Sequence, residues 1–192
     1  MDLTLVKKFY YDLLPEIKPH EWDWVAEHFT VKHVAKGEFL FKAGQVCRHV
    51  SFVNKGLLCM YINSEGKQIV STFVGQGNYI SDYPSFLQCK PGTDYLEALE
   101  DAEIIQLNYE TVQEAYATIP AMQKFGRLIA EYLIIMINEH NKLIYSKTPE
   151  ERYRQMLVES SDLLQRVPQY LIASYIGITP EALSRIRKRI AN

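Results

Sequence analysis

Cysteine is scarce in this chain of 192 residues, and the three that occur, Cys47, Cys59 and Cys89, lie far apart. No two of them form a CxxC pair and their number is odd, so the sequence predicts neither a disulfide framework nor a zinc site. This usage is typical of proteins that work in a reducing cytoplasm.

Long hydrophobic runs are also missing. The longest run of large apolar residues is Leu133–Ile137, whereas a membrane-spanning helix needs about 20 such residues. The N-terminal segment Met1–Phe9 lacks the charged, apolar and small-residue regions of a signal peptide. We therefore expect a soluble cytoplasmic protein that has no membrane partner.

The sequence signatures of common enzymes are absent as well. There is no nucleophile elbow, no Walker A loop and no HExxH motif. No His-x-His occurs, and His33 and His49 are single residues on separate predicted strands, which argues against a metal-dependent enzyme built on a β-barrel. We predict that the protein is not an enzyme and has no metal site.

Charge of one sign is not in large excess, because 21 Lys and Arg residues face 23 Asp and Glu residues. The molecule as a whole therefore lacks the basic character of a protein that binds DNA through its net charge. The charges are unevenly placed, however. Residues 150–192 hold seven cations and five acids, whereas residues 1–149 hold 14 and 18. A mildly acidic body with a basic C-terminal segment suits a regulator that contacts DNA at one end.

Short apolar segments follow one another through the first half of the chain, after two helical segments at residues 2–13 and 19–28. Turn-forming sequences rich in Gly, Pro and Asn separate these segments. About seven short strands at this spacing indicate an antiparallel roll, sandwich or barrel. The expected strands are residues 31–35, 38–42, 49–53, 57–62, 67–74, 94–99 and 102–107.

Helical periodicity returns after residue 108 and is longest between Pro120 and about Tyr145. One apolar stripe recurs by three and four residues in the manner of a heptad seam; it includes Phe125, Ile129, Tyr132 and Met136. A second stripe, which lies off this seam, consists of Leu128, Leu133 and Ile135. A single helix packed on its own sheet accounts for only one stripe, so we predict that the other meets a second subunit in a homodimer.

The segment Val167–Ile190 is typical of two short helices joined at a turn. Pro168 suits the first position of one helix, because it lacks an N–H that would have no partner there. Gly177 supplies the turn, where a side chain would resist a positive φ. Thr179 is then an expected N-cap, followed by Pro180 at the first helical position. We therefore predict a helix-turn-helix.

The second of these helices has two faces. We expect one face to be buried, and it consists of Leu183, Ile186 and Ile190. The opposite face consists of Glu181, Ser184, Arg185 and Lys188, flanked by Arg187 and Arg189. Acids, hydroxyls and cations are the side chains that contact base edges and phosphates in double-stranded DNA. A solvated amphipathic helix is the alternative explanation, but the helix-turn-helix spacing favours DNA.

An antiparallel β-roll, a long helix and a C-terminal helix-turn-helix, in this order, resemble the Crp/Fnr family of bacterial transcription regulators. The resemblance spans essentially the whole chain and is most specific in Ile178–Lys188 and in roll residues 77–82 and 97–101. It implies an α+β fold whose roll is of the double-stranded β-helix or jelly-roll type. The implied domains are a cyclic-nucleotide-binding-like sensor at residues 1–119, a dimerisation helix at residues 120–147 and a DNA-binding domain at residues 148–192.

In this family the segment that follows the glycine corresponding to Gly77 binds the phosphate of a cyclic nucleotide. The resemblance implies an effector pocket formed by Gly77, Ser81, Asp82, Tyr83, Gly92 and Thr93. The arginine that would hold the phosphate is absent, because Gly92 stands at its place. A phosphate in this pocket would lack its strongest partner, so we predict no cofactor and expect no cyclic nucleotide to bind. The sequence leaves open another small molecule, or none.

The resemblance also assigns roles within the helix-turn-helix. It implies that Glu181 and Arg185 read base edges, with Ser184 on the same face, and that Thr179 contacts a phosphate. Pro180 stands where the best-studied members of the family have a reading arginine, so we expect a different target sequence. The chain reaches only two residues beyond Ile190, so we expect no β-wing after this helix. Phosphate contacts are then expected from Gln169, Arg187, Lys188 and Arg189.

Other signals known in the family have little support here. An iron–sulfur sensor requires four cysteine ligands, and the histidines that a haem sensor would use show no pattern. The expected partners are double-stranded DNA with a pseudo-palindromic site and a second copy of the chain, with RNA polymerase as a further candidate. The alternative function is a small-molecule-binding module whose helical tail contacts another protein.

Overall fold

The computed structural model describes residues 1–191, which divide into two compact units. The first unit comprises residues 1–60 and 73–131, and the second comprises residues 61–72 together with the chain from residue 132 onward. The domain limits given above, 1–119, 120–147 and 148–192, stay predictions, and the final residue of the third domain lies outside the described part of the chain.

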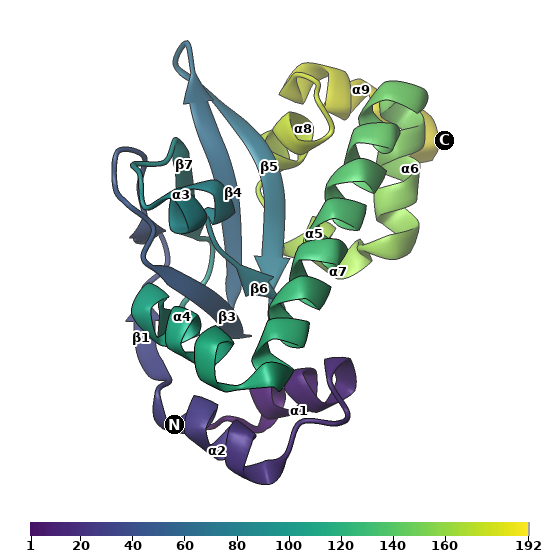
Figure 1. Cartoon of the computed structure of the whole chain (residues 1–192). Helices are drawn as coiled ribbons and strands as arrows, with labels where there is room; N and C mark the ends of the chain where they lie inside the picture. The colour runs from purple at the N-terminus through teal and green to yellow at the C-terminus, as the bar shows by residue number, and fades with distance from the viewer. Residues whose placement is uncertain (192) are drawn as a thin grey trace. The chain divides into compact units, whose positions relative to one another are not determined.

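Eight strands form two four-stranded sheets (Figure 1). The strands are β1 (Thr30–Val34), β2 (Phe39–Phe41), β3 (His49–Lys55), β4 (Leu57–Ser64), β5 (Lys67–Gly75), β6 (Tyr79–Ile80), β7 (Asp94–Ala98) and β8 (Ala102–Asn108). Their order is β1-β8-β3-β6 in one sheet and β2-β7-β4-β5 in the other. This arrangement confirms the predicted antiparallel β-roll. The sequence missed β6, because two residues are too few to show an alternating pattern.

The interior of the roll is apolar over most of its length. Val53 of β3 lies opposite Ile104 of β8, and both side chains are fully buried. They join a cluster that draws on both sheets, formed by Val34, Leu40, Val53, Leu58, Val74, Leu96, Ala98, Ala102 and Ile104. The turn between β3 and β4 closes tightly on this core. A Cβ atom at Gly56 would lie 2.8 Å from the Ala102 Cα, so only glycine fits there.

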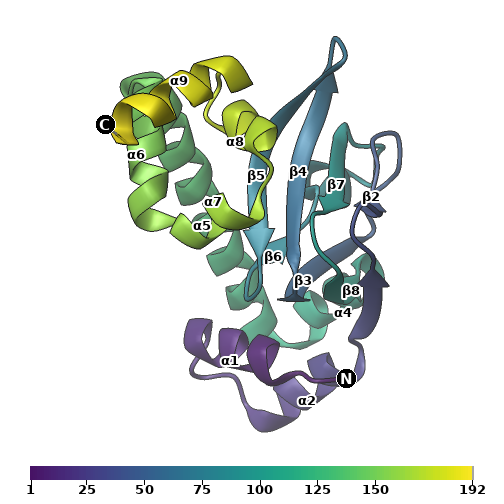
Figure 2. The ribbon, with the colours of Figure 1, turned by 180° about the vertical axis from the view of Figure 1, so that it is seen from behind.

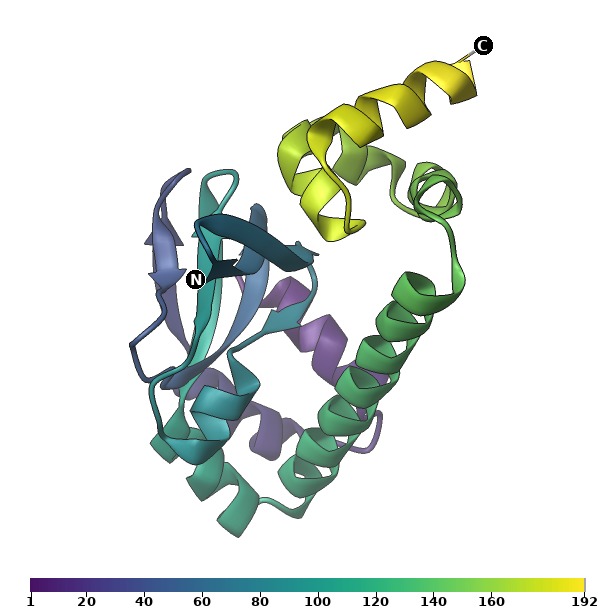
Figure 3. The same ribbon diagram turned by 90° about the horizontal axis from the view of Figure 1, so that it is seen from above.

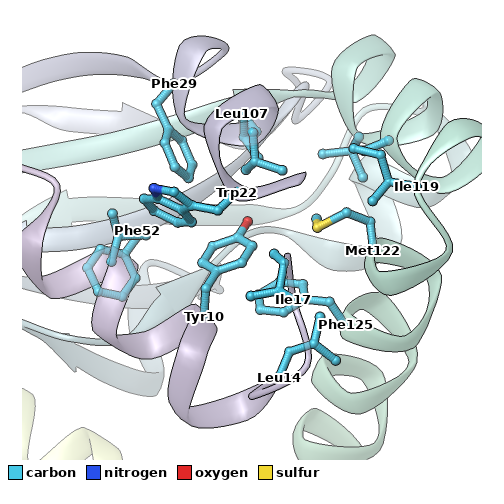
Figure 4. Close-up of a cluster of buried hydrophobic side chains, with 14 of the residues drawn as sticks. Tyr10, Leu14, Ile17, Trp22, Phe29, Phe52, Leu107, Ile119, Met122 and Phe125 are labelled. Atoms are coloured by element: carbon cyan, nitrogen blue, oxygen red, sulfur yellow. The ribbon is translucent and has the colours of Figure 1, made fainter. Parts of the chain in front are cut away.

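A second cluster covers the outer face of β3 and β8 in the first unit. It is formed by α1 (Thr4–Leu13), α2 (Pro19–Glu27), α4 (Tyr109–Thr118) and the first turns of α5 (Pro120–Ser146). Tyr10 stacks on Phe125 with ring centroids 4.2 Å apart and meets Trp22 edge to face (Figure 4). Phe125 is only 6% exposed. It therefore belongs to this core and not to the dimer seam in which the sequence placed it.

Helix α5 is continuous over 27 residues, as the long green helix of Figure 3 shows. Ile129 is half-buried against the same core, whereas the next residues of the helix are open to solvent. Within residues 132–137 the exposed apolar side chains are Tyr132, Ile134, Ile135, Met136 and Ile137, each at least half accessible. Among helices of residues 1–191, none has the length and apolar character needed to cross a bilayer.

Four helices complete the second unit: α6 (Pro149–Glu159), α7 (Ser161–Arg166), α8 (Gln169–Tyr175) and α9 (Pro180–Ala191). Thr148 caps α6, and its side chain accepts from the Glu151 N–H while the Glu151 carboxylate accepts from the Thr148 N–H. This reciprocal pair is a capping box, as the sequence Thr148-Pro-Glu-Glu indicates. Pro168 is the N-cap of α8 and not its first helical residue, so the helix begins one residue later than predicted.

Candidate functional site

The turn between α8 and α9 has the geometry of a Schellman motif. Gly177 adopts a φ of +75°, and its N–H donates to the Ser174 carbonyl at 3.0 Å. The Ile178 N–H donates to the Ala173 carbonyl at 2.9 Å. These two bonds satisfy carbonyls that the end of α8 would otherwise leave unpaired. The turn predicted at Gly177 is therefore confirmed.

Helix α9 begins at Pro180, directly after its cap. The Thr179 hydroxyl accepts from the Ala182 N–H at 3.3 Å, as expected of an N-cap. A hydrogen bond from the Thr179 side chain holds the pKa of Glu181 below its ordinary value, and the Arg185 guanidinium adds a smaller effect in the same direction. Glu181 is therefore ionised at neutral pH and presents an acceptor in the first turn of the helix.

The two faces of α9 are divided largely as the sequence predicts. Leu183 and Ile186 are buried at 1% and 5% exposure, and Ile172 and Ile176 of α8 and its C-cap are buried as well. Ile190 was expected to be buried with them but is only half-buried. The exposed face includes the proposed readers Glu181, Ser184 and Arg185.

Two of the proposed phosphate contacts lie together. The Arg187 Nη1 donates to Gln169 Oε1 at 2.8 Å, which joins α9 to the first residue of α8. Arg189 is instead held by an ion pair with Glu150 of α6, with Nη2 and Oε2 2.8 Å apart. Because this acid offsets its charge, Arg189 is a weaker candidate for a phosphate than Lys188, which is exposed on α9.

A hollow of about 480 Å³ lies between α6 and α9. Its lining consists of Tyr153, Leu157, Ser184, Arg187, Lys188 and Ile190. Ser184 therefore stands at the border between the exposed face of α9 and this hollow. The sequence did not reveal the hollow, since its two walls come from helices whose packing is not encoded in a local pattern.

The first helix of the pair also has a contact that the sequence missed. The Ser174 hydroxyl donates to the Gln68 carbonyl at 2.7 Å and accepts from the Val70 N–H at 3.0 Å. All three residues belong to the second unit, and Figure 2 shows α8 beside β5. Helix α8 is thus attached to the end of the β4–β5 hairpin.

The expected effector residues only partly converge. The segment from Gly77 to Ser85 runs alongside β3, with the Gly77 N–H bonded to the Val53 carbonyl and the Ser81 hydroxyl bonded to the His49 carbonyl. Gly77 therefore lies towards the opposite end of β3 from Ser81. The ring of Tyr83 packs against the helical cluster of the first unit, and Thr93 is exposed.

Asp82 and Gly92 meet closely. The Asp82 carboxylate is 4% exposed and accepts from the Ser85 N–H at 3.0 Å, so it caps the short helix α3 (Tyr83–Gln88). A Cβ atom at Gly92 would lie 1.7 Å from Asp82 Oδ2. An internal carboxylate thus lies against Gly92, the position at which the resemblance implies a phosphate-binding arginine.

A second acid adds to this negative environment. Burial raises the pKa of Asp94, and the neighbouring charge of Asp82 raises it further. Two carboxylates this near to each other disfavour an additional anion. Within residues 1–191, no group of three or more His, Cys, Asp and Glu side chains is placed to hold a metal ion.

The chain is similar in sequence to known proteins. Residues 31–118 match the family described as the cyclic nucleotide-binding domain. The fumarate and nitrate reduction regulatory protein of Vibrio cholerae is 26% identical over 178 residues, which cover 82% of this chain and 67% of that protein.

Solved structures share the fold over most of the chain. A protein of Eubacterium rectale assigned to the crp/fnr family of transcriptional regulators superposes with a TM-score of 0.73 at 17% identity, covering 95% of this chain and 87% of that one. The c-di-GMP-responsive global regulator CLP of Xanthomonas campestris gives a TM-score of 0.74 at 15% identity, with coverages of 91% and 92%. These similarities support the predicted α+β architecture.

Proposed function

We propose that this chain is a transcription regulator of the Crp/Fnr type, which acts as a dimer and reads a specific sequence in double-stranded DNA. Its relatives are regulatory proteins and not enzymes. We place its action in the cytoplasm, with RNA polymerase as a further partner.

The observation that carries the proposal is the exposed face of α9. Glu181 and Arg185 are one helical turn apart, both are exposed, and neither shares in the buried contact with α8. An ionised glutamate accepts from the amino group of cytosine, and arginine donates to both O6 and N7 of guanine. Ser184, between them, supplies a hydroxyl that can donate or accept.

Contacts with the phosphates of the DNA backbone are proposed at both ends of the helix pair. Gln169 and Arg187 are hydrogen-bonded to each other and so join the two helices. Thr179 lies at the N-terminus of α9. Lys188 is a further exposed cation, at the spacing that places it on the face of Ser184 and Arg185. Contacts of this kind fix the register of a protein on the duplex without reading its sequence.

Dimerisation is proposed through the second half of α5. Tyr132, Ile135 and Met136 are at least half exposed in one chain, and an apolar surface of this kind on a helix favours a helix-to-helix contact. Two copies would present two reading helices to a pseudo-palindromic site. Half-sites about one helical turn apart, roughly 34–36 Å, suit this geometry.

The β-roll is proposed to sense a small molecule other than a cyclic nucleotide. The Asp82 carboxylate lies against Gly92, where a phosphate would need a cation. A cyclic nucleotide would place its own negative charge beside Asp82 and Asp94 without a compensating arginine.

Selection of bound duplexes from a random pool tests the proposal. We expect enrichment of a pseudo-palindrome and an affinity that falls steeply with salt, because phosphate contacts release counterions. Arg185→Ala should weaken binding by about 1–3 kcal/mol and relax one base position in each half-site. Arg154→Ala, on the exposed side of α6, is the matched control and should leave the selected sequence unchanged.

Two outcomes would contradict the proposal. If Arg185→Ala selects the same sequence with the same affinity as the wild type, the assignment of Arg185 as a base reader is wrong. Weak binding without any sequence preference would favour the alternative, in which the helical tail contacts another protein.

A further inference from the structure

We propose that the β-roll binds its signal in a cavity at the polar end of its interior, and that the signal is a small carboxylic acid. The proposal rests on the sensor role given above to the β-roll. It moves the ligand site away from Gly77, Asp82 and Gly92, the positions that the family resemblance indicates.

The cavity has a volume of about 480 Å³, which suits a small organic ligand. Its lining consists of Leu40, Phe41, Gln45, Val46, Cys47, Arg48, His49, Ser51 and Gln106. None of the residues expected from the resemblance takes part in this lining. All of the lining residues belong to the first unit.

The register of the strands explains why this end of the roll is polar. Residues that lie opposite each other in an antiparallel pair point to the same face of the sheet. Val53 and Ile104 point into the apolar core, so Ser51 and Gln106, one step further along, point to the same interior. Thr30 continues this polar row on β1, opposite Gln106.

Ser51 and Gln106 are polar groups enclosed in the interior of a roll. They are 2% and 9% exposed, and the Gln106 Nε2 donates to the Ser51 hydroxyl at 2.9 Å. Buried polar groups cost stability relative to an apolar pair of the same shape, unless hydrogen bonds compensate them fully. Both residues lie on the cavity wall. There the Gln106 amide and the Ser51 hydroxyl orient a ligand that carries oxygen atoms.

Cations at the cavity indicate the charge of that ligand. Arg48 lines it, and the Lys32 ammonium donates to the carbonyl of Leu40, another lining residue, at 3.4 Å. Burial lowers the pKa of His49, and the charge of Lys32 lowers it further. His49 is therefore a neutral donor or acceptor at neutral pH, while Lys32 and Arg48 supply the positive charge. A planar guanidinium forms paired hydrogen bonds with a carboxylate.

The acid that faces Arg48 is replaceable. The Glu110 Oε1 lies 3.7 Å from Arg48 Nη1, and both side chains are more than half exposed. An exposed pair at this distance contributes little to stability. A ligand carboxylate can therefore take the place of Glu110 beside Arg48, while Leu40 and Val46 contact its carbon chain.

Cys47 connects this cavity to the segment that the family uses for phosphate. Its N–H donates to the Ser85 hydroxyl at 2.9 Å, and its thiol lies 3.4 Å from the Ser81 hydroxyl. Ser85 in turn donates to the Lys90 carbonyl. A ligand that shifts Cys47 therefore acts directly on α3 and on the loop that follows it.

Thermal unfolding of the full chain in the presence of succinate, glutarate, glutamate and citrate tests the proposal. A ligand that binds only the folded state raises the melting temperature in proportion to its occupancy. We expect at least one of these acids to raise it, and the matched amide succinamide and inorganic phosphate to have no effect at equal ionic strength. Calorimetric titration then gives the dissociation constant of the active acid.

Two variants locate the binding site. Arg48→Met should weaken binding of the active acid about tenfold, as expected for loss of one charge-assisted hydrogen bond. The double variant Ser51→Ala with Gln106→Leu removes both partners of the Ser51–Gln106 hydrogen bond, so neither side chain is left unpaired, and it should weaken binding by a similar factor. Lys90→Met, on the loop after α3, is the control and should bind as the wild type does.

The proposal is overturned if none of the four acids raises the melting temperature, if phosphate acts as well as they do, or if Arg48→Met and the double variant bind the acid unchanged. Binding to DNA is measured separately in the duplex selection. Failure of that selection with intact acid binding would refute the DNA-reading proposal alone, whereas intact selection without acid binding would refute only this one.

Discussion

The hydroxyl of Ser174 links α8 to the backbone of the edge strand β5, donating to the Gln68 carbonyl and accepting from the Val70 N–H. Strand β5 lies at the end of its sheet, and such a strand presents N–H and C=O groups without a neighbouring strand. One side chain thus satisfies two backbone groups and fixes α8 on the hairpin.

Ser174→Ala should therefore destabilise the second unit by about 1–3 kcal/mol, because it leaves two half-buried backbone groups without their partner. Hydrogen exchange should show faster exchange of the Val70 amide, and denaturant titration should show the lower free energy of unfolding. Ser184→Ala, at an exposed position of α9, is the control for stability. Unchanged exchange at Val70 would show that the hydroxyl does not hold the strand.

This contact illustrates what the sequence could and could not reveal. The caps at Thr148 and Thr179 and the turn at Gly177 were predicted correctly, because each depends on residues within a few positions of one another. The partners of Ser174 lie 104 and 106 residues away. No local pattern distinguishes such a serine from one that faces solvent.

The same reasoning explains the errors within the first unit. Phe125 has the heptad spacing of a dimer seam, yet its ring stacks on Tyr10 of a helix more than 100 residues earlier in the chain. The periodicity identified the apolar side of α5 but not the surface it meets. Likewise, the resemblance indicated the place of the missing arginine at Gly92, but only the fold shows that the Asp82 carboxylate lies against it.

The packing of Asp82 on Gly92 predicts an energetic coupling between the two positions. Gly92→Ala should lower the free energy of unfolding by about 1–3 kcal/mol, because the new Cβ would overlap with the Asp82 carboxylate. In an Asp82→Ala background the same substitution should cost much less. A double-mutant cycle measured by denaturant titration gives the coupling, and additive effects of the two substitutions would contradict the predicted overlap.

Asp94 predicts a pH dependence of stability with a definite sign. Its pKa is raised in the folded protein, so just above the ordinary value of 3.8 the folded chain binds more protons than the unfolded chain. Stability therefore falls as pH rises through this window, and the loss persists at neutral pH.

Asp94→Asn removes this titration and should stabilise the protein at pH 7 but not at pH 3. The measurement is the difference between variant and wild type in the free energy of unfolding from pH 3 to pH 7. In this difference the contributions of the other acidic residues cancel. Asp23→Asn, at an exposed position of α2, should give a flat difference curve. A flat curve for Asp94→Asn as well would mean that the carboxylate is not disfavoured in the fold.

The exposed apolar side chains in the second half of α5 predict which substitution disrupts the proposed dimer. Ile135 is 60% exposed in one chain and lies one turn from Tyr132. In a dimer formed through this surface, Ile135→Glu would place two carboxylates in an apolar contact, where each loses its hydration without gaining a partner. We expect a monomer in sedimentation equilibrium at micromolar concentration, with the fold retained because Ile135 is outside both core clusters.

Loss of the dimer should also weaken binding to the full pseudo-palindrome much more than binding to an isolated half-site, because only a dimer engages two half-sites at once. Asn138→Glu adds the same charge at an exposed polar position of the same helix and should remain dimeric. If Ile135→Glu sediments as the wild type does and retains its preference for the full site, the subunits meet through a surface other than residues 132–136 of α5.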